Sequence, residues 1–169
     1  MFNLDYWEKR IGKDDSLKYW TLDHLYAVFS MTSFREMGEV ALEMVRGMPQ
    51  PVEQVCGPIS SGGYRSIRAN VEAFDATIRK LTQQGRVVFN QMPFEAPMQH
   101  LRGRSLLPLR KTKQKLLNDF YLPLFESGLV VKINCIDDWK SSSGARWEHW
   151  VTGRNGIERV YLPKGFHLD

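Results

Sequence analysis

The stretch Ser141-Ser-Ser-Gly-Ala-Arg-Trp-Glu148 follows an apolar run at residues 129–136, which predicts a strand. A helix predicted at residues 142–155 begins inside the stretch. Small and hydroxyl residues at a helix start leave backbone N–H groups free to bind an anion. Glu148 shares a face with small and apolar residues, where a carboxylate is costly to bury unless it is paired or used. A solvent-facing Glu148 beside an ordinary helix cap is the alternative interpretation.

The same alternation of strand and helix extends back to residue 52. It predicts a parallel sheet with helices on both faces, because right-handed crossovers join parallel strands. We therefore expect a flavodoxin- or Rossmann-like three-layer αβα fold with a four- to five-stranded, mostly parallel sheet. Strands are expected at 52–56, 86–90, 129–136 and 156–162, a loop at 91–108, and helices at about 67–84, at 109–126 with a kink at Pro123, and at 142–155.

The first 50 residues predict a helical N-terminal extension, which leaves residues 51–169 as the αβα domain. Ser33-Phe-Arg-Glu36 has the pattern of a capping box, and apolar residues follow it at helical spacing until Gly47. A second, shorter amphipathic helix is expected around residues 22–29.

Composition narrows the class of protein. The chain has 169 residues and a formal net charge of +4, which suits one domain and an anionic ligand. No apolar run is long enough to span a membrane, and charged residues near the N-terminus argue against export, so a cytoplasmic location is expected. Cys56 and Cys135 are expected to be reduced core residues, and no metal or other cofactor is expected.

A second loop, Gly57-Pro-Ile-Ser-Ser-Gly-Gly63, also follows a strand and precedes a helix. Its glycines let the backbone approach an oxyanion closely, although it lacks the ending of a Walker A loop. Because both loops follow parallel strands, we expect them at the same sheet edge, where they form one anion site.

The two loops together, with Asp119 and Trp139, resemble the nucleoside 2-deoxyribosyltransferase-like superfamily, which includes deoxyribonucleoside 5′-monophosphate N-glycosidases. The similarity covers roughly residues 52–162, and it implies an enzyme that cleaves or transfers at an N-glycosidic bond. Cys56 stands where family members often have tyrosine, and His149 and Trp150 stand where the family has small residues.

The resemblance implies a role for particular residues. Glu148 takes the place of the nucleophilic carboxylate, and Asp119 that of an aspartate near the base. The substrate-binding positions are Gly57, Ile59, Ser60, Ser61, Gly62, Gly63, Arg65, Trp139, Ser142 and Gly144, with Ser142 placed to hold a 5′-phosphate and Trp139 to stack on a base.

The chemistry is consistent with these residues, because an oxocarbenium-like carbon needs a carboxylate on one face and proton delivery to the leaving base. We expect the dipole of the helix to keep Glu148 ionised. The expected partners are a nucleoside or nucleoside monophosphate and further copies of the chain, with no membrane. A non-catalytic nucleotide sensor on the same fold is the alternative, and nucleic-acid binding through the basic segment 102–115 is disfavoured because aromatic residues are missing from it. The sequence leaves open which base and sugar the substrate contains, whether the substrate is phosphorylated, and whether water is the acceptor.

Overall fold

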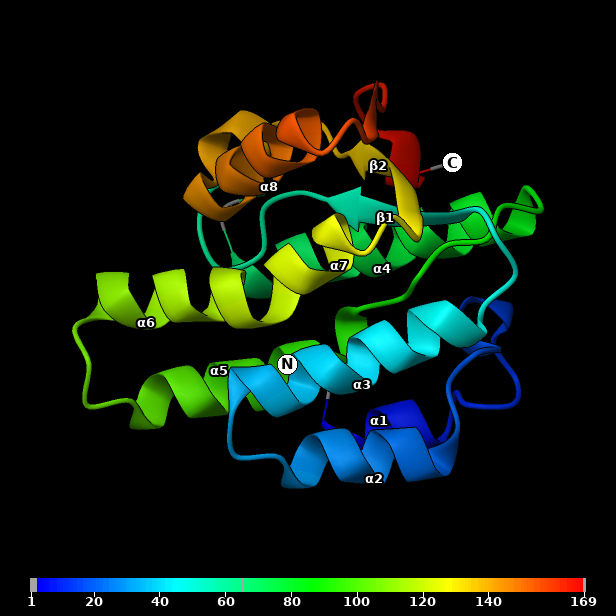
Figure 1. Ribbon diagram of the computed structural model, residues 1–169. Helices are drawn as coiled ribbons and strands as arrows, with labels where there is room; N and C mark the ends of the chain where they lie inside the picture. Colours follow the sequence, from blue (N-terminus) through cyan, green and yellow to red (C-terminus); the bar gives the residue numbers. More distant parts are fainter. Residues whose placement is uncertain (1–2, 65, 169) are drawn as a thin grey trace.

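The computed structural model describes residues 3–64 and 66–168. Helices and a small parallel sheet make up the fold (Figure 1). The strands are β1 (Val52–Cys56), β2 (Val130–Cys135) and β3 (Glu158–Tyr161). The α-helices are α1 (Leu4–Glu8), α2 (Leu22–Ser30), α3 (Phe34–Gly47), α4 (Ile67–Gln83), α5 (Glu95–Arg104), α6 (Leu109–Leu116), α7 (Leu122–Glu126) and α8 (Ser143–Arg154).

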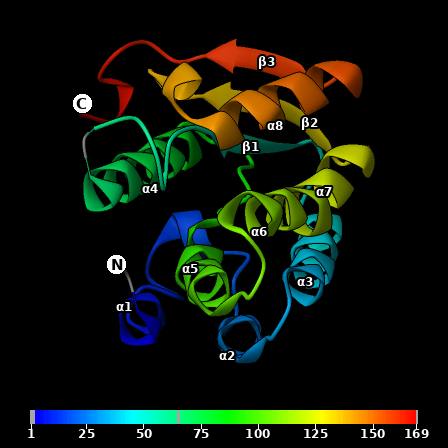
Figure 2. The ribbon, with the colours of Figure 1, turned by 90° about the vertical axis from the view of Figure 1, so that its left-hand side faces the viewer.

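The sheet has the order β1-β2-β3, and both neighbouring pairs are parallel. Cys56 lies opposite Cys135 at the end of the first pair, and Cys135 lies opposite Tyr161 in the second. Figure 2 shows α4 on one side of the strands and α7 and α8 on the other. The general α/β class is therefore as predicted.

The prediction of a four- to five-stranded sheet is wrong, because the sheet in the described residues has three strands. Residues 86–90 touch β1 through a single parallel bridge, in which the Glu53 N–H donates to the Val87 carbonyl and the Phe89 N–H donates to the Glu53 carbonyl, each at 2.8 Å. The Asn90 side chain then accepts from the Met92 N–H at 3.0 Å. That local turn draws the chain away from the sheet before a second rung can form.

The expected loop at residues 91–108 is also wrong. A short 3₁₀ turn at Met92–Phe94 leads into α5. Pro97 is tolerated there because the N–H groups of the first helical turn need no intrahelical partner. Helix α5 buries its first turn instead of presenting an amphipathic stripe, so it carries no strong helical period.

The helix expected at 109–126 is interrupted near Tyr121, where Pro123 predicts a kink or a split. A π-helical turn (Leu117–Tyr121) separates α6 from α7, with Pro123 in the first turn of α7. Pro123 cannot donate to the carbonyl of Asp119, four residues earlier. That carbonyl faces α3 instead, because a Cβ built on Gly38 would lie 2.3 Å from it.

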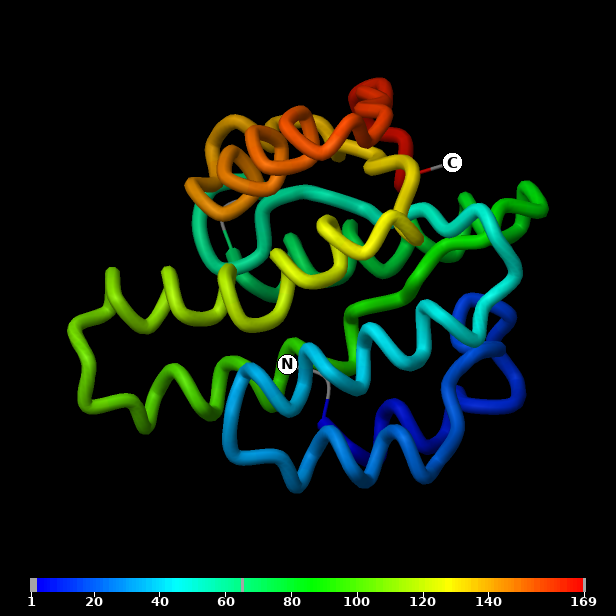
Figure 3. The backbone as a smooth tube through the Cα atoms, viewed as in Figure 1, coloured from blue at the N-terminus to red at the C-terminus, as the bar shows by residue number. Residues whose placement is uncertain are grey.

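The helices of the N-terminal 47 residues pack beside α5 beneath the sheet layer, as the ribbon and the tube show (Figures 1 and 3). The predicted capping box is confirmed, since Ser33 Oγ accepts from the Glu36 N–H at 3.2 Å and Glu36 accepts from the Ser33 N–H at 3.0 Å. The Trp20 indole donates to the Asn90 carbonyl at 2.9 Å. These contacts make the N-terminal helices part of the same hydrophobic core.

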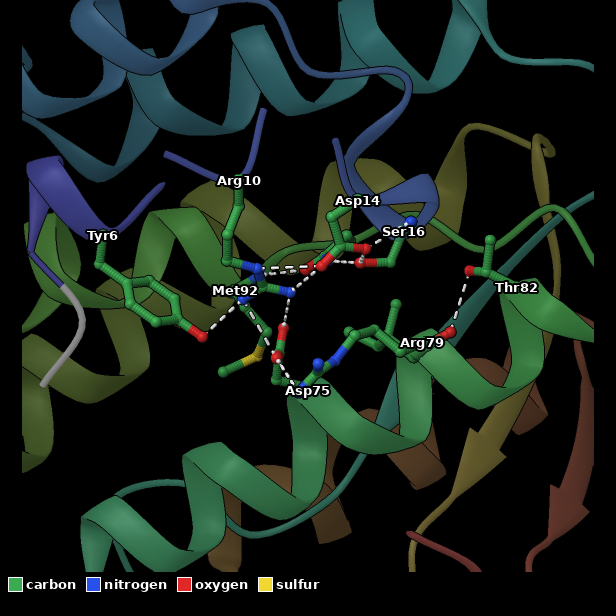
Figure 4. A network of polar contacts seen from close by, with 10 residues as sticks. Tyr6, Arg10, Asp14, Ser16, Asp75, Arg79, Thr82 and Met92 are labelled. Atoms are coloured by element: carbon green, nitrogen blue, oxygen red, sulfur yellow. Dashed lines mark hydrogen bonds and ion pairs between the residues drawn. The ribbon is translucent and has the colours of Figure 1, made fainter. Parts of the chain in front are cut away.

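A buried ion pair holds the N-terminal segment against α4 (Figure 4). The Asp75 carboxylate is 1% exposed and lies 3.1 Å from the Arg10 guanidinium and 3.1 Å from that of Arg79. Arg10 also donates to Asp14 and to the Tyr6 hydroxyl, the latter at 2.8 Å. Burial raises the pKa of Asp75, and the Arg10 charge opposes that shift.

The close approach of α3 to the π-turn predicts the effect of a single methyl group. Gly38→Ala should destabilise the fold by about 1–3 kcal/mol, because the new Cβ meets backbone that cannot move aside alone. Gly47→Ala, in the same helix, has nothing within 4 Å of the added Cβ and should be neutral or slightly stabilising. Urea unfolding of both variants measures the difference, and equal stabilities would contradict the packing described.

No helix in residues 3–64 and 66–168 has the length and apolar character needed to cross a membrane. Within the same residues, His, Cys, Asp and Glu side chains form no cluster of three that could hold a metal ion.

Candidate active site

The candidate site lies where β1 and β2 end. Residues 86–90 flank β1 on one side and β2 flanks it on the other, so the order reverses between β1 and β2. Ligands of open parallel sheets bind at such a point, beyond the carboxyl ends of the strands. The loop 57–63 leaves β1 there, and the loop 136–142 leaves β2.

The two loops touch, as the sequence predicts. The Gly63 N–H donates to Ser141 Oγ at 2.9 Å, and Ser141 Oγ in turn donates to the Asp138 carbonyl at 2.7 Å. Gly62 has a φ of +72°, and a Cβ on it would lie 2.2 Å from Ser141 Oγ. Glycine is therefore required at position 62 by both the backbone conformation and the space.

Asn70, on α4, fixes the shape of the glycine-rich loop and was not predicted from the sequence. Its side-chain N–H groups donate to the carbonyls of Ile59 and Gly62 at 3.0 and 2.9 Å, and its oxygen accepts from the Tyr64 N–H at 2.7 Å. Asn70 is buried, so these bonds preorganise the loop from below.

The start of α8 forms the second wall of the site. Ser142 caps the helix by accepting from the Ala145 N–H at 3.4 Å. The N–H groups of Ser143 and Gly144 lie in the first turn, where no helical carbonyl is in reach. Lys113, from α6, donates to the Ser143 hydroxyl and thus places an ammonium group at the positive end of the helix dipole. Burial lowers the pKa of Lys113.

Glu148 lies further along α8 and faces inward. It is 7% exposed and has no ion-pair partner within the described residues. Burial raises the pKa of Glu148 well above its usual range, and the neighbouring Cys135 and Glu95 add to the shift. This shift opposes the expectation that the helix dipole keeps Glu148 ionised, because the dipole acts within the first turn and Glu148 lies beyond it.

Glu95, the first residue of α5, is the carboxyl group that sequence reasoning missed. It is 7% exposed and lines the same pocket as Glu148. Burial raises the pKa of Glu95 to about 7, while Arg102 opposes the shift. The sequence signal for Glu95 is a carboxylate inside the apolar run Met92-Pro-Phe-Glu-Ala-Pro-Met98. Because residues 91–108 were expected to form a loop, where a glutamate is ordinarily exposed, Glu95 was not predicted as a site residue.

The pocket joins these groups in one narrow space of about 60 Å³, which is room for a few water molecules. Both loops and the α5–α6 hairpin contribute to its walls. The lining residues are Gly57, Ile59, Ser60, Glu95, Met98, Gln99, Arg102, Lys113, Leu116, Leu117, Tyr121, Ser142, Gly144, Ala145 and Glu148.

Most of the predicted site residues are brought together, and some are not. Gly57, Ile59, Ser60, Ser142, Gly144 and Glu148 line the pocket, while Ser61, Gly62 and Gly63 line an adjoining hollow that shares Ser60. Arg65 lies outside the described residues.

Asp119 and Trp139 lie elsewhere. The Asp119 carboxylate pairs with Lys115, is largely buried and does not line the pocket. Trp139 stacks on His149 with ring centroids 4.1 Å apart and planes at 19°, and its hollow is lined by β2–α8 loop residues and Tyr161. The structure therefore gives Trp139 a stacking partner of its own outside the pocket.

The two cysteines are free thiols, as predicted, and they adjoin the site. The Cys56 thiol interacts with both Cys135 and the Glu148 carboxyl, and it lies 3.6 Å from the Ala145 carbonyl. The hydrogen bond with Cys135, together with burial, raises the pKa of Cys56 well above its usual range. Cys56 thus remains a neutral thiol, and its single proton, which is donated to the Ala145 carbonyl, can turn to Glu148 only by leaving that carbonyl.

Comparisons of the chain with protein-family models, with curated proteins and with solved structures found no match.

Proposed function

We propose that the protein cleaves the N-glycosidic bond of a nucleoside 5′-monophosphate, with Glu148 as the nucleophile. The observation that carries this proposal is a buried carboxyl group, without an ion-pair partner, that faces a pocket beside an anion-binding helix start. A carboxyl kept in that setting is costly to the fold unless it is used. Attack on the anomeric carbon is the use that fits a neighbouring phosphate site.

The phosphate binds at the start of α8 and the glycine-rich loop. The free N–H groups of Ser143 and Gly144, the hydroxyls of Ser60 and Ser142, and the Lys113 ammonium are the donors. Lys113 exchanges the Ser143 hydroxyl for a phosphate oxygen, a stronger charge-assisted partner. That exchange releases the contact between α6 and α8 and widens the narrow pocket for the sugar.

A panel of nucleosides and their 5′-monophosphates, assayed for released base by chromatography, tests the proposal. We expect the monophosphates to have a kcat/KM about 10- to 100-fold above that of the nucleosides, the effect of a hydrogen bond to a charged group. Lys113→Met should remove most of that preference by raising KM for the monophosphates only. Lys111→Met, an exposed lysine of the same helix, is the matched control and should change neither parameter.

The second candidate function, a nucleotide sensor, is favoured by the raised pKa of Glu148, which disfavours the ionised, nucleophilic form. Tight binding of a monophosphate by the wild-type protein, with no base released from any of them, would support the sensor and refute the enzyme.

A further inference from the structure

Glu95 lines the candidate pocket from α5, together with Met98 and Gln99. In the proposed function, the phosphate lies at the start of α8 and the glycine-rich loop, and the sugar carbon lies beside Glu148. The α5 wall is then the part of the lining that is left for the base. Glu95 is buried there, and no described residue forms an ion pair with it.

We propose that Glu95 is the catalytic residue that donates a proton to the leaving base, an inference that rests on the proposed N-glycosidic chemistry. A nitrogen base leaves poorly as an anion, so the reaction needs an acid on the base side of the sugar. Among the described residues, Asp119 faces Lys115 outside the pocket, which leaves Glu95 as the second carboxyl of the site.

The reaction balances with two carboxyl groups and one water molecule. A Glu148 carboxylate oxygen attacks the anomeric carbon, the bond to the base nitrogen breaks, and its electron pair takes the proton from Glu95. The products are a glycosyl ester of Glu148, a neutral base and the Glu95 carboxylate. Water then gives a proton to Glu95 while its oxygen attacks the anomeric carbon, which releases the sugar and restores both groups.

The surroundings support a pair of carboxyls that share one proton. Two buried carboxyls that interact disfavour double ionisation. The Cys56 thiol and the Lys113 ammonium lower the pKa of Glu148, whereas burial and the Glu95 charge raise it. The reactive form, with the charge on Glu148 and the proton on Glu95, is therefore the one that bound substrate must select.

The test compares two leaving groups. Glu95→Gln should lower the single-turnover rate of base release from 2′-deoxyguanosine 5′-monophosphate by about 10²- to 10⁴-fold. The same variant should lower that rate for the 7-methylated nucleotide less than about 10-fold, because that base is already cationic and leaves without a proton. Glu126→Gln, an exposed glutamate on α7, is the matched control and should match the wild type on both nucleotides.

The outcomes separate the two proposals. Equal losses for both nucleotides, or no loss for either, would overturn the role of Glu95 while leaving the proposed function intact. Release of no base from any monophosphate of the panel by the wild-type protein would overturn the proposed function and the role of Glu95 with it.

A second readout needs no turnover. The pKa of Glu95 is raised from 4.5 to about 7 on folding, so its contribution to stability is complete below about pH 4.5 and is lost as pH rises through about 7. The urea midpoint of the wild type should fall across that window, and Glu95→Gln should flatten the fall. The groups that face this carboxyl pair are Cys56, Arg102, Lys113, Tyr121 and Cys135. An unchanged pH profile in Glu95→Gln would show that Glu95 holds no proton in this window and would overturn its role.

Discussion

Glu148→Gln is expected to abolish base release, with a fall in kcat on the order of 10⁴ or more, because the amide keeps the shape of the side chain but cannot attack the sugar. Binding of the monophosphate, measured by calorimetry, should change little because the phosphate donors lie at the start of α8. The variant should fold, since it removes a buried titratable group and keeps its volume.

Two further variants sharpen this test. Glu148→Ala opens space for a small anion, and azide should partly restore base release by replacing the carboxylate. Asp119→Asn is the matched control, because its carboxylate lies outside the pocket beside Lys115, and its kcat should stay within a few-fold of the wild type. A strong loss in Asp119→Asn together with normal turnover in Glu148→Gln would show that Asp119, and not Glu148, is the carboxylate that the reaction needs.

The second large effect concerns stability. Arg10→Met should lower the free energy of unfolding at neutral pH by roughly 3–5 kcal/mol, because it leaves the Asp75 carboxylate buried with only the half-exposed Arg79 beside it. Arg68→Met is the matched control and should change stability little, since Arg68 and Glu72 form an exposed pair that water screens. Urea unfolding measures both.

The loss in Arg10→Met should depend on pH. Removal of the Arg10 charge raises the pKa of Asp75 further, so the carboxyl takes up a proton more readily in the folded protein. The deficit should therefore be largest at neutral pH and should shrink as pH falls toward 4. A deficit that is equal at all pH values would show that lost packing, and not the unpaired carboxylate, dominates.

Local signals in the sequence predicted the elements that depend on local physics. The capping box at Ser33 gave α3, the apolar period from Ile67 to Leu81 gave α4, and the hydroxyl before Ser143 gave the start of α8. The pairing of the two loops followed from strand order alone, because parallel strands place their following loops at one edge.

What the sequence did not reveal depends on tertiary contacts. The run at 86–90 is strand-like, but whether it joins the sheet is decided by the Asn90 turn. The sequence of helix α5 has no amphipathic period, and the helix is placed by tertiary packing that buries its first turn. Asp119 lies in a π-turn, whose extra residue rotates the following side chains by about 100° relative to an α-helix, so its direction could not be read from spacing. Glu95 becomes recognisable as a site residue only once α5 is known to face α8.

The contact between the two loops limits how this chain can diverge. Gly62 and Ser141 occupy one small space from positions far apart in the sequence, so a larger residue at either one removes the room needed by the other. Because Gly62 also needs its positive φ, the room is set from one side, and position 141 should accept only residues about as small as serine, with Asn70 held constant beneath the loop. In a population of functional variants, both positions would therefore stay small, although the two segments share no secondary-structure element.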